Sequence, residues 1–466
     1  MRPFLPSVLC CVAATLTACV PAESPTAPSQ RAVPIAPQLT LIVSDVADLG
    51  ALGGDIVGPG DINDFGQIVG SITFSTEPSR AFLWENGALT PLFPGSVGSS
   101  SGASGMNNLG QIVGRGPFAA AVWNNGKVTE LAGLSSGSGV AWAINDRGQI
   151  VGSSRNAANQ DRAVLWPDGT PFVVPTDLGT LGGDESFAVA INYGGQIVGT
   201  SRNAAAQLHP VLWENGTATD LGTLGGDRGD AMAINDLGQI VGASQTAAGI
   251  THATFWKNDG TPTDLGTVSD NFSQANDINQ LGQIVGHSID ANGVSHALLW
   301  MDGSRYELGN PSGSTGSVAV AINNLGEVVG RTVNPYHLVR WQVAMRATID
   351  IAPGDATNAI KLSGAGTITV AILGSRYFDA AQIDARTVTL GNEDGSDTPV
   401  ARKKSGQPAA TLKDVNRDGY PDLVLDFDRR QIMTTGDLNA SSTQLVLLGS
   451  RIDGRRVRGV DRVTVQ

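Results

Sequence analysis

The sequence predicts an all-β protein: a seven-bladed β-propeller closed by an N-terminal strand and followed by a small β-sandwich-like domain. The string GQIVG occurs six times in the chain, and a seventh copy reads GEVVG. The copies begin at residues 66, 110, 148, 195, 238, 282 and 326, so successive starts lie 44, 38, 47, 43, 44 and 44 residues apart. A period of this size is typical of a propeller blade rather than of a solenoid coil.

Each repeat divides into four short strands, as the fifth repeat illustrates. Its first strand ends in Ile234-Asn235, and a turn with Asp and Gly leads into the second strand, Gly238 to Ser244. The third strand ends at Trp256, and the fourth is Asp264-Leu265-Gly266. The adjacent Ile and Val of GQIVG point to opposite faces of the second strand, so both faces must be covered, as they are when blades stack.

The strand count indicates how the ring closes. The last repeat ends without a fourth strand, whereas Asp48-Leu49-Gly50 precedes the first repeat with no strands of its own. If residues 40–50 pair with the last repeat, every blade has four strands and no sheet edge is left exposed. An open stacked array is the alternative, and it would need capping ends that the sequence does not show.

The repeat consensus, A-x-A-I-N-x-x-G-Q-I-V-G-x-S followed by H-A-x-L-W and D-L-G-T-L-G-G-D, resembles the HAF family of extracellular repeats over residues 40–343. His252-Ala253 and His296-Ala297 hold the position from which the family takes its name. The resemblance implies an extracellular repeat protein and says little about activity.

The N-terminus resembles a bacterial lipoprotein signal. Arg2 is followed by a short apolar run, and Leu16-Thr17-Ala18-Cys19 has the small-residue pattern of a lipobox. We therefore expect residues 1–18 to be a signal peptide, Cys19 to carry a lipid, and the Pro-rich residues 19–39 to form a tether. By resemblance to Gram-negative lipoproteins, Val20 after the cysteine favours the outer membrane or cell surface. An ordinary secretory signal cut elsewhere is the alternative.

Charge is divided unevenly along the chain. Residues 1–345 contain 14 Lys and Arg against 28 Asp and Glu, and residues 346–466 contain 16 against 15. An acidic repeat region repels phosphate backbones, so we expect no nucleic-acid partner. We also expect membrane contact only through the lipid and a monomeric chain.

The repeat ends near residue 345, and residues 346–466 read as a separate C-terminal β domain. It contains one candidate metal site, which resembles the calcium loops of FG-GAP repeats and dockerins. Its spacing offers side-chain oxygens, one backbone carbonyl and a glycine for the sharp turn, as a calcium loop requires. A polar turn that binds nothing is the alternative. The expected ligands are Asp414, Asn416, Asp418, the carbonyl of Tyr420, and Asp422, and the glycine is Gly419.

Histidine and tryptophan recur at fixed positions. Four histidines lie four residues before a repeat tryptophan, and we expect them to make hydrogen bonds at the loop edge rather than to bind zinc: His209, His252, His296 and His337. The repeat tryptophans are expected to pack between blades. Trp142 lies in a first strand and is also expected to be packed, with exposure to the channel opening as the alternative, whereas His287 is expected to be solvated.

These features favour a non-enzymatic binding module for a protein or carbohydrate ligand. We expect recognition at the loops after the second strands, residues 155–161, 202–207 and 245–251. The sequence has no Walker loop, GxSxG elbow or HExxH motif. The alternative is a polysaccharide-processing hydrolase or lyase with its site at the channel mouth, which would need a non-repeating cluster of carboxylates or histidines. A third possibility is a structural spacer.

Overall fold

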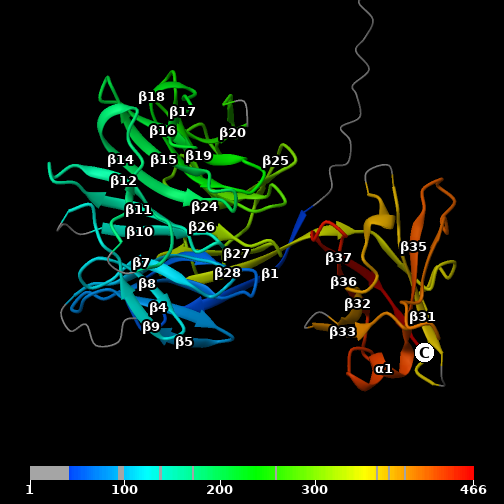
Figure 1. Ribbon diagram of the computed structural model, residues 1–466. Coiled ribbons are helices and arrows are strands. Elements are labelled where there is room, and N and C mark those ends of the chain that lie inside the picture. The colour runs from blue at the N-terminus through cyan, green and yellow to red at the C-terminus, as the bar shows by residue number, and fades with distance from the viewer. Residues whose placement is uncertain are drawn as a thin grey trace, which may run out of the picture. The chain divides into compact units, whose positions relative to one another are not determined.

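A computed structural model describes residues 41–92, 99–135, 139–170, 173–257, 260–363, 366–375, 378–392 and 395–466. These residues form β-strands, one short α-helix and one 3₁₀ turn. The prediction of an all-β fold is confirmed, and the repeats form four-stranded sheets of the β-propeller type (Figure 1). In the described part of the chain, no helix is long and apolar enough to cross a membrane.

Six four-stranded antiparallel sheets follow one another through the first six repeats, and each contains four consecutive strands in sequence order. The first three sheets consist of β2 (Ile56–Ile62), β3 (Ile68–Thr73), β4 (Arg80–Glu85) and β5 (Ala88–Pro91); β6 (Gly102–Met106), β7 (Ile112–Arg115), β8 (Ala120–Asn124) and β9 (Lys127–Glu130); and β10 (Gly139–Ile144), β11 (Ile150–Arg155), β12 (Asp161–Trp166) and β13 (Thr176–Asp177). The next three consist of β14 (Gly182–Ile191), β15 (Ile197–Asn203), β16 (Leu208–Glu214) and β17 (Thr217–Asp220); β18 (Gly225–Ile234), β19 (Ile240–Thr246), β20 (Thr251–Trp256) and β21 (Pro262–Asp264); and β22 (Phe272–Ile278), β23 (Ile284–Ile289), β24 (Ser295–Met301) and β25 (Ser304–Glu307).

The seventh repeat supplies three strands, β26 (Gly316–Ile322), β27 (Glu327–Val333) and β28 (Leu338–Ala347). The N-terminal strand β1 (Leu41–Gly50) pairs antiparallel with β28, with Asp48 opposite Val339. In this position β1 replaces the fourth strand that the last repeat lacks (Figure 1).

The GQIVG strand is buried on both faces, as its adjacent Ile and Val predict. In the first repeat Ile68 and Val69 are fully buried. Ile68 packs in a cluster with Val329 and Leu338 of the last repeat, whereas Val69 packs with Ala103 and Ile112 of the second. Each sheet therefore stands between two hydrophobic layers that it shares with its two neighbours.

Most repeat tryptophans fill the space between sheets. Trp166, Trp256 and Trp341 are almost completely buried, and their indole N–H groups donate to carbonyls at the end of the preceding repeat, at 2.8, 3.1 and 3.1 Å. The prediction of core tryptophans is confirmed at these positions. Trp142 is different, because 41% of its side-chain surface is exposed, and the expectation of a packed side chain is wrong there.

The C-terminal region also consists of sheets. One contains β29 (Ile349–Ile351), β31 (Thr367–Ile372), β35 (Asp422–Asp428) and β34 (Ala410–Lys413) in the order β29-β31-β35-β34. The end of β28 pairs in parallel with β37 (Arg456–Arg462), which continues to β36 (Gln444–Ser450), β32 (Thr389–Asn392) and β33 (Gly395–Pro399). The remaining elements are β30 (Ala359–Ile360), β38 (Thr464–Val465), the 3₁₀ turn η1 (Ala380–Gln382) and α1 (Arg429–Thr434). One hydrophobic cluster contains buried residues from Met345 to Val463, and its members from the repeats are Met345 and Ala347 at the end of β28.

Candidate functional site

A closed ring of asparagine side chains lies where the first strands end. Each Nδ2 donates a hydrogen bond to the backbone carbonyl of the asparagine in the next repeat, at 2.9–3.4 Å. The last one, Asn323, donates to Asn63, 260 residues earlier in the chain. The members of this asparagine ring are Asn63, Asn107, Asn145, Asn192, Asn235, Asn279 and Asn323.

Each ring asparagine also holds its own turn together. The Oδ1 of Asn235 accepts the backbone N–H groups of Leu237 and Gln239 at 3.1 and 3.0 Å, and its Nδ2 donates to Oε1 of Gln239 at 2.7 Å. Gln239 is the glutamine of GQIVG. The repeated Asn and Gln are therefore structural partners that fix the turn and the contact with the next sheet.

A second ring lies next to the first, made by the residue after each asparagine. The backbone N–H of Asp64 donates to Oδ1 of Asn108 at 3.0 Å, and the N–H of Asn324 donates to Oδ1 of Asp64 at 2.8 Å. Tyr193 occupies this position in the fourth repeat, where its ring has no oxygen near the backbone. It is 52% exposed, and the Arg147 guanidinium lies 4.2 Å from its ring centroid. The fourth repeat therefore interrupts an otherwise polar ring.

A pocket of about 240 Å³ opens at the centre of these two rings. Asp64, Asp146 and Asp236 of the second ring contribute to its wall, and so do two further carboxylates, Asp61 and Asp277. Both occupy the position two residues before the ring asparagine, where the other five repeats have only glycine or alanine: Gly105, Ala143, Ala190, Ala233 and Ala321. The pocket thus contains one feature that does not repeat, and it was visible in the sequence as Asp-Ile-Asn in the first and sixth repeats only.

The two carboxylates are held between neighbouring sheets by main-chain donors. Asp61 accepts from the N–H of Ile62 at 2.8 Å and from Met106 of the next sheet at 2.9 Å. Asp277 makes the same pair of contacts, with Ile278 and with Ile322, both at 2.8 Å. These bonds fix both side chains at the channel wall.

Despite these donors, burial raises the pKa values of both carboxyl groups and is the largest effect on them. Loss of water, helped by the negative charge of Asp277, raises the pKa of Asp61 to about 7 against the lowering effect of the two N–H donors. Desolvation likewise raises the pKa of Asp277 to about 6. The pocket therefore contains two carboxyl groups that take up or release a proton near neutral pH.

Exposed apolar side chains lie at the tips of the same turns, outside the lining of the pocket. Phe65 is 73% exposed, Leu109 67% and Leu237 63%, and each lies two residues after a ring asparagine. Leu325 holds the same position in the last repeat and is 38% exposed. We call these four side chains the turn tips. Apolar groups gathered on one face of a protein mark an interaction surface more often than scattered ones do.

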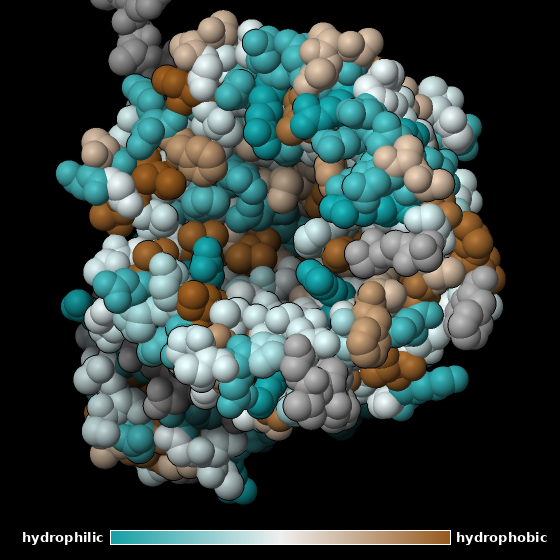
Figure 2. All heavy atoms as spheres, turned by 90° about the vertical axis from the view of Figure 1, so that its left-hand side faces the viewer, coloured by the Kyte–Doolittle hydropathy of each residue, from teal (hydrophilic) through white to brown (hydrophobic). Residues whose placement is uncertain are grey.

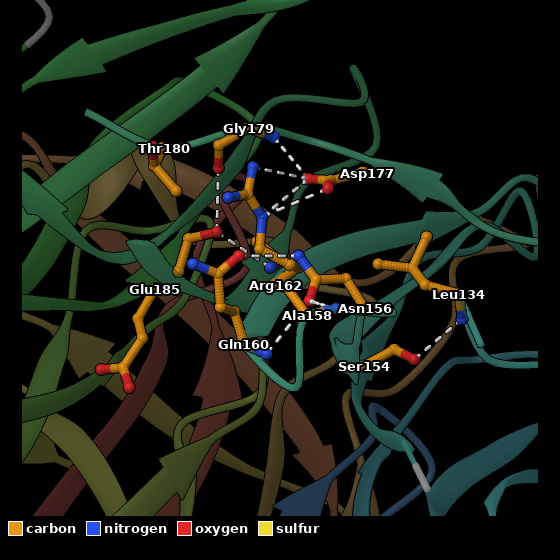
Figure 3. A network of polar contacts seen from close by, with 12 residues as sticks. Leu134, Ser154, Asn156, Ala158, Gln160, Arg162, Asp177, Gly179, Thr180 and Glu185 are labelled. Atoms are coloured by element: carbon orange, nitrogen blue, oxygen red, sulfur yellow. Dashed lines mark hydrogen bonds and ion pairs between the residues drawn. The ribbon is translucent and has the colours of Figure 1, made fainter. Parts of the chain in front are cut away.

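The loops expected to bind a ligand lie at the opposite ends of the strands, because consecutive strands are antiparallel. The face at that end is hollowed at its centre, and hydrophilic and hydrophobic residues are mixed around the hollow (Figure 2). Polar side chains in its loops make hydrogen bonds within the loops. Asn156 closes the loop of residues 155–161 by bonding Ala158 and Gln160, and nearby Arg162 of the third strand pairs with Asp177 of the fourth at 3.2 Å (Figure 3).

His209 and His252 make the hydrogen bonds expected of the repeat histidines. Nδ1 of His209 lies 2.8 Å from Oδ2 of Asp220, and Nδ1 of His252 lies 2.8 Å from Oδ2 of Asp264. In the described part of the chain, no three His, Cys, Asp or Glu side chains are placed to hold a metal ion. His287 is not solvated as expected: it is partly buried against Phe272, and desolvation lowers its pKa to about 4.

The candidate calcium loop is an exposed turn whose oxygens bond to its own backbone. Asp414 accepts the N–H groups of Asp418 and Gly419, at 3.2 and 3.0 Å. Asn416 Oδ1 accepts from Asp418 N–H at 3.1 Å, and Gly419 has φ of 91°, which permits the sharp turn. Asp422 is buried below the loop, with its oxygens bonded to Gly374 N–H and Val415 N–H, both at 2.7 Å. The donor types fit calcium. Cys19 lies outside the described residues.

No protein-family model and no curated protein sequence matches this chain. Similar solved structures include TolB from Acinetobacter baumannii, at 12% identity and a TM-score of 0.38, covering 60% of this chain and 66% of that one. A puromycin hydrolase is 11% identical with a TM-score of 0.46, covering 70% of this chain and 59% of that one. The β-propeller domain of the Trilobed protease from Pyrococcus furiosus is 8% identical with a TM-score of 0.40, covering 61% and 95%.

Proposed function

We propose that this protein is a lipid-anchored, extracytoplasmic seven-bladed β-propeller that binds a protein or carbohydrate ligand without transforming it. Closure by β1 and the asparagine ring support the seven-bladed arrangement, since the seventh asparagine bonds to the first. The proposal includes a lipid on Cys19, attachment to the outer membrane or cell surface, a Pro-rich tether, and a C-terminal β domain over residues 346–466.

The observation that carries the binding function is the combination of turn tips and pocket on one face. Phe65, Leu109 and Leu237 offer apolar contact area, and the pocket offers carboxylates and amides. Recognition sites commonly combine apolar contacts with a few fixed polar groups. The ligand would rest on the turn tips and place a polar or cationic group toward Asp61 and Asp277.

The face opposite the turn tips supports recognition less well. Its loops make internal hydrogen bonds, as Asn156 does with Ala158 and Gln160, and the two non-repeating carboxylates, Asp61 and Asp277, line the pocket of the turn face instead. We therefore move the proposed ligand site from the loops after the second strands to the turn face.

An enzymatic function is the second candidate, and one observation favours it. Asp61 and Asp277 are the non-repeating carboxylates that a hydrolase or lyase would need at the channel mouth, and a carboxyl group with a pKa near 7 can act as a general acid. Against this, both carboxylates are fixed by main-chain N–H donors of two adjacent sheets, which gives them a structural role without any substrate.

The test compares matched variants of the mature chain, residues 19–466, on arrays of glycans and of cell-surface proteins. L109S/L237S removes two turn tips, and Phe118→Ser is the control, because Phe118 is 78% exposed in a loop between a second and a third strand. We expect array binding to fall at least about tenfold for L109S/L237S and to stay unchanged for the control. An equal fall in array binding for both variants would contradict the proposed ligand site.

The same protein separates the two candidate functions. Release of reducing ends from a polysaccharide by the wild type, abolished in D61N/D277N, would replace the binding proposal with the hydrolase or lyase. Binding without any release of product supports the non-enzymatic module.

A further inference from the structure

The C-terminal region contains a groove of about 740 Å³ that the proposed function does not use. Its floor is one face of the sheet β29-β31-β35-β34, with Thr367 and Thr369 on β31 and Val424 on β35. Its walls come from three other segments: residues 352–354, residues 359–361, and residues 411–417. A volume of this size accommodates a small ligand or a short stretch of a polymer.

The alternation of side chains along the strands explains why this floor is polar. Ile368 and Val370 of β31 point to the opposite face and are buried in the hydrophobic core. Thr367 and Thr369 therefore face the groove, and Thr369 Oγ1 donates to Asp426 at 2.7 Å. The floor offers hydroxyl groups beside a small apolar surface.

Four cationic side chains from different segments line the groove: Lys361, Lys413, Arg417 and Arg429. The first three are exposed, and the described residues place no carboxylate within ion-pair distance of them. Among the described lining residues the one carboxylate is Asp414, and its oxygens already accept the backbone N–H groups of Asp418 and Gly419. Asp426 lies beside the floor, where its Oδ1 accepts from Thr369. The groove is therefore a concentration of positive charge in a chain whose formal net charge is −13.

We infer that this groove binds an acidic polysaccharide. Carboxylate groups spaced along such a chain would pair with the Lys and Arg side chains, and its hydroxyl groups would meet the threonines of the floor. The apolar faces of the sugar rings would rest on Val424, which is partly exposed at the floor. Because the threonine hydroxyls lie at the floor of a recessed groove, a chain that enters the groove reaches them and a flat bilayer surface does not.

This site is independent of the proposed turn face. The pocket of the turn face is lined by the carboxylates of Asp61 and Asp277, which would repel a polyanion, whereas the groove attracts one. Substitutions that abolish binding at one site should leave binding at the other unchanged.

The experiment measures binding of alginate oligosaccharides, which carry one carboxylate per sugar, to residues 19–466 by titration calorimetry. K361Q/K413Q/R417Q removes three groove cations. The control, R346Q/K404Q/R430Q, removes three exposed cations that do not line the groove, so both variants have the same net charge. We expect at least about a tenfold rise in Kd for the groove variant and less than a twofold change for the control. Neutral maltooligosaccharides should not bind to the groove.

Three outcomes would overturn the inference. The first is no alginate binding by the wild type, and the second is an equal loss in both variants, which would indicate diffuse attraction. The third is tighter binding of anionic phospholipid vesicles or duplex DNA than of alginate at the same salt concentration. Circular dichroism of each variant separates loss of binding from loss of folding.

Discussion

Nδ1 of His337 lies 2.9 Å from Oδ2 of Asp48, although 289 residues separate them in the chain. In the fourth and fifth repeats the corresponding pairs lie within one sheet, 11 residues apart for His209 and Asp220 and 12 for His252 and Asp264. Asp48-Leu49-Gly50 thus takes the position of an Asp-Leu-Gly fourth strand. The repeated third-strand histidine makes its contact even where the partner comes from the other end of the repeat region.

We expect loss of β1 to destabilise the repeats far more than loss of this one contact. A chain starting at Ala51 exposes the edge of β28, which loses its antiparallel partner, so it should unfold at a much lower urea concentration or fail to fold. Asp48→Ala removes only a part-exposed pair and should cost about 0–1 kcal/mol. Equal urea midpoints for the shortened chain and the wild type would contradict closure by β1.

The sequence predicts the repeats, the positions of their strands and the role of residues 41–50, because local periodicity determines each of them. Ile68 and Val69 are adjacent and apolar, which requires two covered faces, and the structure buries them in two different clusters. Trp142 could not be placed in this manner. It lies at a bulge of β10, where the register shifts between Ala141 and Ala143, and such a shift redirects a side chain in a way that periodicity does not show.

An asparagine of the ring should contribute more to stability than an asparagine that makes the same bonds in a turn outside the ring. Asn235→Ala removes the bond to Asn279 and leaves the buried turn amides unsatisfied, so we expect a loss of roughly 2–4 kcal/mol in the free energy of unfolding. Asn156→Ala is the matched control. Asn156 makes the same contacts within its turn but no hydrogen bond to a neighbouring sheet, and we expect it to cost about 1 kcal/mol. Similar urea midpoints for the two variants would show that the bonds between sheets add nothing.

The candidate site was harder to predict than the fold. Asp-Ile-Asn at Asp61 and Asp277 is a visible departure from the repeat, but its meaning depends on two facts that a single sequence does not contain. The two repeats lie on either side of the seventh in the closed ring, and both carboxylates face one pocket. Differences between repeats become interpretable only when the order of the sheets around the ring is known.

The two channel carboxylates should make stability fall as pH rises. In the unfolded chain an Asp carboxyl group loses its proton near pH 3.8, whereas folding raises the pKa of Asp61 to about 7 and that of Asp277 to about 6. The native state therefore holds more protons between these values, and its stability declines from about pH 4 until Asp61 is ionised near pH 7. A shift of about three pKa units corresponds to roughly 4 kcal/mol, and the partial exposure of both aspartates reduces this, so we expect about 1–3 kcal/mol.

The measurement is the free energy of unfolding in urea at pH 4 and pH 8 for the wild type and for D61N/D277N. Other titrating groups are common to both proteins, so the difference between the two pH dependences isolates the pair. We expect the variant to lose less stability than the wild type over this range. Parallel pH dependences would mean that the two carboxylates are ionised in the native state at ordinary pH values.

Calcium should stabilise the C-terminal region if its loop binds the ion. Asp414, Asn416 and Asp418 supply side-chain oxygens within one exposed turn, and binding to the native state alone raises stability by about 2.7 kcal/mol at a free concentration of about 100 times Kd. We therefore expect calcium to raise the Tm of residues 19–466 above its value in chelator. Asp418→Ala should remove this difference, whereas Asp453→Ala, which changes an exposed carboxylate in another turn of the same region, should keep it. Identical melting curves of the wild type in calcium and in chelator would identify residues 414–422 as an ordinary polar turn, held by the bonds that Asp414 and Asp422 make to the backbone.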